Sequence, residues 1–288
     1  MNRRTCLFGS LIVFSACGGS LDPLGPGGEI ASLPTPAPPS RFTEKVGSDG
    51  EIEEGTIGSA LFLHDSGEPT ATDDTPYAAQ ATVCPGSSKV YGLDVSYYQG
   101  TINWSQVKAA GKQFAIVRVS DGTGFMDPKF EANWKGAKAA GIAVGAYQFF
   151  RPNQDATAQA DLLVNQLNKV GFGSGDIPPV IDVEVTGGMS DATVAARVNT
   201  WLQRVKSRTG RLPILYTSPG FWSGLGNPTP SPLPYLWDAH WGVSCPLLPP
   251  NWGRLRFWQY SATGRVSGIS GNVDLDLYNG SLAELRGL

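Results

Sequence analysis

From residue 90 onward, short apolar runs alternate with longer stretches in which apolar residues recur at helical spacing. Runs of roughly four to eight residues rich in β-branched and aromatic side chains are typical of strands. The strand candidates are VYGLDVS, FAIVRVS, AVGAYQFF, PPVIDVEV, LPILYTS, PYLWDAHWG, LRFWQYS and NVDLDLY. The helix candidates lie between the first five of these runs, at residues 104–111, 129–140, 155–169 and 191–209.

The clearest predicted helix covers residues 191–209, because Ser190 or Asp191 can cap its first turn and Gly210 follows its end. Strands that alternate with helices indicate an α/β fold with a parallel sheet, and eight strands suggest closure into a barrel. The last three strand candidates are joined by loops rich in proline and glycine. We therefore predict an incomplete TIM-like (β/α) barrel of eight strands, with helices missing between the last strands.

The first part of the chain has a different composition. Residues 1–17 run from Arg3 and Arg4 through a short apolar stretch to Cys17, which is the order of a signal peptide. The ending FSACGG resembles a bacterial lipobox, in which Cys17 would carry a lipid; an ordinary cleaved signal peptide is the alternative. Residues 18–88 are rich in proline, glycine, serine and acid, so we expect a flexible tether. Residues 89–288 then form the folded domain.

The targeting signal predicts an exported protein of the cell envelope, either anchored to a membrane through Cys17 or secreted. Residues 18–88 carry eleven acidic and two basic residues, a net charge of −9, whereas residues 89–288 carry 18 basic and 14 acidic residues, a net charge of +4. A positive balance of this size is too weak to argue for nucleic acid, although it is compatible with an anionic polymer. No P-loop or dinucleotide fingerprint is present.

The cysteines and histidines restrict the chemistry further. Once Cys6 and Cys17 are assigned to the signal, Cys84 and Cys245 remain, and a disulfide is their expected state in an oxidising compartment. The spacing of cysteines and of the two histidines supports no zinc site. We expect no metal and no cofactor.

Two carboxylates stand one residue apart in the apolar run PPVIDVEV. Side chains alternate along a strand, so Asp182 and Glu184 point to the same side, roughly 6.5 to 7 Å apart. In a barrel, residues at the C-terminal ends of the strands face the active site. The same argument places Asp94 at the end of the first strand and Asp274 or Asp276 at the last. Because the first and last strands are neighbours in a closed barrel, we expect these acids to converge.

Crowded carboxylates raise one another's pKa, so one stays protonated while another stays ionised. In the absence of metal or a partnered histidine, this arrangement favours glycoside cleavage. Each signal also has an ordinary explanation, because a lone acid can cap a turn and aromatic residues fill protein cores. Several aromatic residues near the same strand ends could stack on sugar rings: Tyr97, Tyr98, Tyr147, Phe149, Tyr216, Trp237, Trp241, Trp258 and Tyr260.

The opening YGLDVSYYQGTINW is similar to that of glycoside hydrolase family 25, the lysozymes that cut after N-acetylmuramic acid in peptidoglycan. The resemblance covers nearly all of residues 90–281 in the family's order, through FAIVRVSDGTGFMDPKFEANWKGAKAAGIAVGAYQFF, PPVIDVEV, PILYTSPGFW, LWDAHWG and FWQYSATGRVSGISGNVDLDLYNG. It implies an incomplete eight-stranded barrel, and it makes residues 89–288 a catalytic domain of this family.

The resemblance also implies roles for individual residues. Glu184 matches the general acid, and Asp182 matches the acid that assists the substrate's acetamido group or shapes the charge around the transition state. Asp94 and Asp274 match the acids of the first and last strands. Four further residues fall at positions that resemble substrate-binding ones: Tyr147, Tyr216, Trp258 and Gln259.

The leading hypothesis is a muramidase that hydrolyses the β-1,4 bond between N-acetylmuramic acid and N-acetylglucosamine. Its partners are then peptidoglycan glycan strands and, through Cys17, a membrane; no nucleic acid and no protein partner is implied. The alternatives are a non-catalytic peptidoglycan-binding lipoprotein that retained the cleft, and a chitinase-like endoglycosidase.

Overall fold

The computed structural model describes residues 80–288. The predicted signal peptide with Cys17 and most of the predicted tether, residues 1–79, lie outside the described residues. Within residues 80–288, the helices are all too short or too polar to cross a bilayer.

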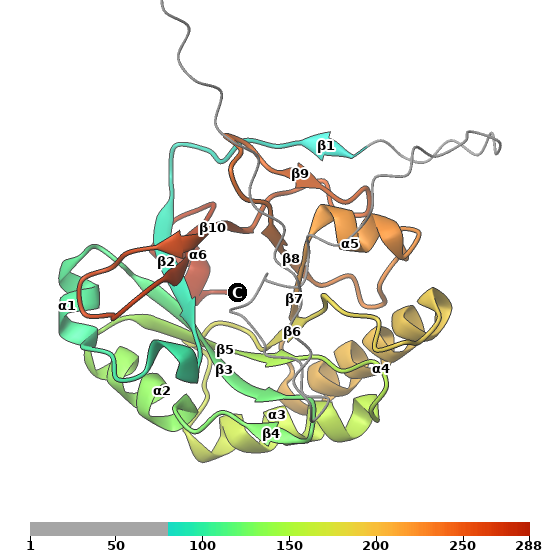
Figure 1. The fold of residues 1–288 in the computed structure, drawn as a ribbon, viewed down its shortest axis with the longest axis horizontal. Helices are drawn as coiled ribbons and strands as arrows, with labels where there is room; N and C mark the ends of the chain where they lie inside the picture. The colour runs from blue at the N-terminus through green and yellow to red at the C-terminus, as the bar shows by residue number, and fades with distance from the viewer. Residues whose placement is uncertain (1–79) are drawn as a thin grey trace, which may run out of the picture.

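Eight strands close into a barrel (Figure 1). They are β2 (Val90–Val95), β3 (Phe114–Asp121), β5 (Ala143–Phe149), β6 (Val180–Asp182), β7 (Ile214–Thr217), β8 (Tyr235–Ala239), β10 (Phe257–Gly264) and β11 (Val273–Tyr278). Neighbours follow the order β2-β11-β10-β8-β7-β6-β5-β3, and pairing of β2 with β3 closes the ring. The short β4 (Phe125–Met126) adds to β3 outside the ring. The predicted eight-stranded barrel is confirmed.

Helices cover one part of the barrel (Figure 1). They are α1 (Trp104–Ala109), α2 (Phe130–Ala139), α3 (Ala156–Lys169), α4 (Asp191–Thr209) and α5 (Pro219–Gly224), with a 3-10 helix at Tyr97–Gln99. As predicted, the described chain has no helix between β8 and β10 or between β10 and β11. The ends of α4 also agree with the sequence, because the Ser190 hydroxyl accepts a hydrogen bond from the Thr193 N–H and Gly210 takes the left-handed conformation at φ 69°.

The last strand departs from the parallel arrangement that the strand–helix alternation indicates. Strand β11 runs antiparallel to both β10 and β2, whereas the other ring pairs are parallel. The connection from β10 to β11 holds no helix that could carry the chain back along the barrel. The start of β11 therefore lies beside the C-terminal end of β2, and Asp274 pairs in register with Asp94.

Side-chain alternation separates two apolar clusters. The larger cluster lies on the outer side of the strands, where Leu93 and Val117 pack with residues of the helices. The smaller cluster fills the barrel interior and includes Phe114, Phe257 and Tyr278. Leu285 of α6 (Leu282–Arg286), which follows β11, belongs to this interior cluster. Apolar side chains therefore fill the interior at the α6 end, and polar residues gather at the opposite, C-terminal mouth.

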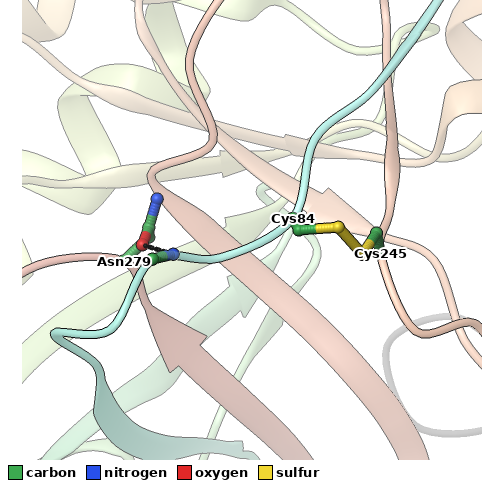
Figure 2. The surroundings of a disulfide bond; sticks show 4 residues. Cys84, Cys245 and Asn279 are labelled. Atoms are coloured by element: carbon green, nitrogen blue, oxygen red, sulfur yellow. Dashed lines mark hydrogen bonds between the residues drawn. A yellow bond between two sulfur atoms is a disulfide. The ribbon is translucent and has the colours of Figure 1, made fainter.

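Residues 80–88, which the sequence pattern assigns to the tether, are attached to the domain. Strand β1 (Ala81–Thr82) pairs antiparallel with β9 (Leu247–Leu248) in the loop between β8 and β10. Cys84 and Cys245 form the disulfide that was expected, and the Gly86 N–H donates to Asn279 Oδ1 at 2.8 Å (Figure 2). In Figure 1 this segment lies across the barrel from α2 and α3.

Candidate active site

Strand β6 delivers the acid pair to the mouth of the barrel. Val180 belongs to the interior cluster and Val183 to the outer cluster, so alternation turns Asp182 and Glu184 inward. The regular strand ends at Asp182, inside the predicted run PPVIDVEV, although the Val183 N–H still donates to the Tyr216 carbonyl at 2.9 Å. Asp182 is fully buried and Glu184 is 5% exposed.

Two further acids meet the pair from the neighbouring side of the ring. Asp94 near the end of β2 and Asp274 near the start of β11 are register partners, and both are buried. Asp182 is the register partner of Tyr216, and the Gln259 amide joins Tyr216 to Asp94. Burial raises the pKa of the Tyr216 hydroxyl, and the four nearby acids raise it further: Glu184, Asp182, Asp94 and Asp274. The structure thus brings the four sequence-predicted acids together around Tyr216.

Burial and crowding change the protonation of these acids. Burial raises the pKa of Asp94 to about 7, and hydrogen bonds from Gln259 and from Asp276 lower it in part. Burial also raises the pKa of Asp274 well above its usual range, and the charges of Asp94, Asp276 and Glu184 add to this shift. Asp274 is consequently uncharged at neutral pH, while Asp94 exchanges its proton close to neutrality.

Gln259 of β10 connects the acids to two aromatic side chains. Its amide Nε2 donates to Asp94 Oδ2 at 2.8 Å. Its Oε1 accepts from the Tyr216 hydroxyl and from the Trp241 indole Nε1, both at 3.0 Å. Because two donors converge on the oxygen, the amide can present only its N–H side to Asp94. Tyr147 of β5 is buried in the same mouth, where the charges of Asp94 and Asp182 contribute to its raised pKa.

Trp258 is the one sequence-predicted binding residue that the structure does not bring to this group. It precedes Gln259 on β10, and neighbouring residues of a strand face opposite sides. Trp258 accordingly belongs to the outer cluster, packs edge-on against Tyr260 at 5.8 Å, and donates its indole Nε1 to the His240 carbonyl at 2.7 Å. Trp258 faces outward because its neighbour Gln259 faces the barrel interior.

The rim carries a cationic and aromatic group, of which Tyr97 and Tyr98 were predicted from sequence and Arg118 and Phe125 were not. Arg118 of β3 lies within 5.5 Å of the ring centres of Tyr97, Tyr98 and Phe125, and its Nε donates to Asp127 Oδ2 at 3.1 Å. The rings of Tyr98 and Phe125 are about two-fifths exposed. The signal for Arg118 was present in FAIVRVS, where a charged residue interrupts an apolar strand in the same way as Asp182 does in PPVIDVEV.

Two other buried acids accompany the group. Asp276, the sequence-based alternative to Asp274, faces the interior two residues farther along β11 and accepts a hydrogen bond from the Trp237 indole at 3.0 Å. Asp238 of β8 faces the opposite way, next to the inward Trp237. Neither oxygen of Asp238 has a hydrogen-bond partner among the described residues, and burial raises its pKa well above the usual range.

The assembled group fits one kind of chemistry. It offers buried carboxyls that differ in pKa, hydrogen-bond donors that fix their orientation, and aromatic rings at the rim. In residues 80–288 no cluster of histidine, cysteine, aspartate and glutamate is arranged to hold a metal ion. Breaking a glycosidic bond requires one carboxyl that donates a proton and others that stabilise the positive charge developing on the sugar. Fold and site together define a glycoside hydrolase.

Comparison with known proteins identifies the family. The model of glycosyl hydrolases family 25 matches residues 93–269. Lysozyme M1 from Streptomyces globisporus is 41% identical over 220 residues, which are 73% of this chain and 74% of that protein. N,O-diacetylmuramidase from Chalaropsis sp is 30% identical over 205 residues, covering 64% of this chain and 96% of that protein.

Solved structures agree with this result. The crystal structure of the bacterial lysozyme from Streptomyces coelicolor is similar with a TM-score of 0.64 and 40% sequence identity, covering 70% of this chain and 98% of that one. The chain belongs to glycosyl hydrolase family 25, and it is a muramidase that acts on peptidoglycan. The match of the family model includes Asp94, Asp182 and Glu184 but stops before Asp274, whose place in the site rests on its register with Asp94.

Proposed function

We propose that the enzyme hydrolyses the β-1,4 bond between N-acetylmuramic acid and N-acetylglucosamine, with Glu184 as the group that protonates the leaving oxygen and then activates water. Glu184 lies two residues beyond the end of β6 and is slightly exposed, whereas Asp182 is fully buried. A proton donor has to reach the glycosidic oxygen, and this difference in exposure favours Glu184 over its neighbour.

The other acids support the charge that develops on the sugar. Asp182 assists the acetamido group of the substrate and balances positive charge at the reacting carbon. Asp274 is uncharged at neutral pH because burial and neighbouring acids hold its pKa high. We therefore assign it hydrogen-bond donation. Asp94, held by the Gln259 amide, orients water or Asp182.

The single observation that carries this proposal is the meeting of four buried carboxyls at one mouth of the barrel. Asp182 is the register partner of Tyr216, and Glu184 follows on the same side. Asp94 is joined to Tyr216 through Gln259 and is the register partner of Asp274. Pairs of titratable groups whose surroundings separate their pKa values are the mark of acid–base assignments. Here Asp94 has a pKa of about 7, while Asp274 holds its proton well above that value.

The Glu184→Gln variant tests the assignment of the proton donor. The amide keeps the size of the side chain but cannot donate a proton to the leaving oxygen, so release of reducing ends from purified peptidoglycan is expected to fall by about 10²- to 10⁴-fold. Glu131→Gln is the matched control, because Glu131 is an exposed acid on α2 that pairs with Lys135. Near-normal turnover by Glu184→Gln would exclude Glu184 as the donor.

Substrate comparison separates this proposal from the two alternatives. Turnover of peptidoglycan with little turnover of chitin oligomers is expected, whereas the reverse preference would indicate a chitinase-like enzyme. Pull-down on peptidoglycan without release of reducing ends by the wild-type protein would indicate a binding lipoprotein. The Glu184→Gln variant is expected to remain bound in the same pull-down, since it keeps the shape of the cleft.

We also propose that the protein is exported and held at the cell envelope through a lipid on Cys17. The support is the order of Arg3, Arg4, apolar run and FSACGG in the sequence. Fractionation of cells that express the wild type or Cys17→Ser tests this. The wild type is expected in the membrane fraction and the variant in the soluble exported fraction. Equal release of both proteins would leave an ordinary signal peptide as the explanation.

A further inference from the structure

Asp276 is a carboxyl inside the barrel that the proposed chemistry does not use. It lies on β11, two residues after Asp274, and pairs in register with Gly92 on one side and Gln259 on the other. Its side chain is completely buried. Because residues two apart on a strand point the same way, Asp276 sits directly below the acids of the mouth.

The contacts of Asp276 are unusual for a carboxyl. Oδ1 accepts a hydrogen bond from the Trp237 indole Nε1 at 3.0 Å. Oδ2 has no N–H or O–H donor among the described residues. The carboxyl is instead in hydrogen-bonding contact with the carboxyl of Asp94, which also accepts from the Gln259 amide.

Two ionised carboxylates have only acceptors to offer, so their contact requires a proton between them. The charge of Lys112 acts on Asp276, but the two residues form no ion pair in the described structure. Burial and the charge of Asp94 raise the pKa of Asp276 well above its usual range. The same contact lowers the pKa of Asp94. The proton therefore belongs to Asp276, and Asp94 is the acceptor.

We propose that Asp276 is a positioning residue that stays protonated and donates a hydrogen bond from its carboxyl to Asp94, holding Asp94 in its ionised form and in a fixed orientation. Trp237 and Gln259 complete the arrangement, because Trp237 fixes Asp276 from below and Gln259 fixes Asp94 from the side. The inference rests on the role proposed above for Asp94, and it adds a fifth acid whose task is to supply a donor.

The charged and titratable groups that interact electrostatically with Asp276 come from several elements. Asp94 lies on β2, Asp274 on β11 itself, Lys112 in the turn before β3, and Tyr260 on β10. Among them Asp274 is uncharged at neutral pH and burial lowers the pKa of Lys112. Asp94 is the group closest to titration near pH 7, so a change at Asp276 should appear first in Asp94.

Two variants of Asp276 test the proposal through the pH profile of peptidoglycan hydrolysis. In Asp276→Asn, the amide can still donate to Asp94 and accept from Trp237, so the profile is expected to stay within about threefold of wild type at every pH. In Asp276→Leu, the donor is lost and the pKa of Asp94 rises. The limb of the profile that reports ionisation of Asp94 should move up by about one pH unit. Thermal unfolding of both variants shows whether each is folded.

A measurement on the wild-type protein tests the protonation of Asp276 directly, without an activity assay. The carbon NMR resonance of the Asp276 carboxyl, assigned with Asp276→Asn, is expected to keep the shift of a protonated acid between about pH 5 and pH 8. The Asp94 resonance is expected to titrate within that interval. The proposal is overturned if Asp276 is ionised there, if Asp276→Asn loses activity as fully as Asp276→Leu, or if a folded Asp276→Leu keeps the wild-type profile.

Discussion

The two ends of the barrel interior are built on the same strands with opposite chemistry. At the α6 end, Phe257 packs against Phe114 and Tyr278 with ring centres 5.9 and 4.9 Å apart, and Leu285 joins the same cluster. At the mouth, inward positions of the same strands carry acids, amides and hydroxyls. Strand β11 shows the change within one element, since Asp274, Asp276 and Tyr278 succeed one another along its inward row.

This difference between the two ends indicates that one end mainly stabilises the fold and the other mainly serves the reaction. The apolar end gains free energy from burial, as in any core. The mouth holds several carboxyls out of water, which disfavours their ionised forms and costs stability. The acids are therefore retained for what they do to a substrate, and removing a side chain's buried group at the two ends should change the free energy of unfolding in opposite directions.

The largest effect on stability is expected from Phe257→Ala at the apolar end. Removing a buried aromatic ring leaves a cavity, so the free energy of unfolding should fall by about 3–5 kcal/mol. Chemical denaturation measures this change, and turnover per folded molecule should stay near wild type because the acids remain in place. Loss of turnover in molecules that are still folded would show that the two ends are not independent.

The converse change is Asp274→Asn at the mouth. The folded protein keeps Asp274 protonated whereas the unfolded chain ionises it at neutral pH, so the amide should raise the free energy of unfolding by about 1–3 kcal/mol. Peptidoglycan hydrolysis per folded molecule should stay within about threefold of wild type, because the amide can still donate the hydrogen bond assigned to Asp274. A variant that is less stable than wild type would contradict the view that the buried acid is costly.

The stabilisation by Asp274→Asn should depend on pH. An aspartate whose folded pKa lies above the unfolded value contributes no penalty below the unfolded value, here 3.8, and an increasing penalty as pH rises above it. The variant should thus be nearly as stable as wild type at about pH 3.5 and progressively more stable than wild type towards pH 7. Denaturant midpoints of both proteins across this interval measure the difference. A constant difference would assign the effect to packing.

The smallest effect is expected from Asp238→Asn. Asp238 is a buried acid on the outer side of the barrel, so this variant separates the effect of burying an acid from the effect of its place in the mouth. Asp238 is as buried as the acids of the mouth and has no hydrogen-bond partner among the described residues, but it faces away from them. Neutralising it should raise the free energy of unfolding by about 1 kcal/mol and leave hydrolysis unchanged. A loss of hydrolysis would show that Asp238 communicates with the site.

Much of the barrel could be predicted because its information is local. Apolar runs, the cap at Ser190 and the stop at Gly210 each depend on a few neighbouring residues, and they located the strands and α4. The direction of β11 could not be predicted in this way, because the length and composition of the loop before it do not specify whether the chain returns parallel or antiparallel.

The site was predictable where an acid interrupts an apolar run, as at Asp182, Glu184 and Asp94. Trp258 was predicted together with Gln259, although alternation allows only one of two neighbours to face inward. The pairing of Asp276 with Asp94 joins residues far apart in the sequence, and only the register of β11 with β2 reveals it. Arg118 likewise interrupts an apolar run, and the same criterion predicts it as a member of the site.

The disulfide also determines how the domain would respond to mechanical load. A pull applied to the chain before Cys84 is met first by the pairing of β1 with β9, and then by the covalent bridge to Cys245 in the loop after β8. The load therefore divides at Cys84 before it reaches β2. In the reduced protein the same pull would act directly along β2, the strand that carries Asp94, and would peel it from the ring. Whenever the chain before Cys84 is held and the enzyme is bound to its polymer substrate, the bridge would keep that load from acting on the strand that carries Asp94.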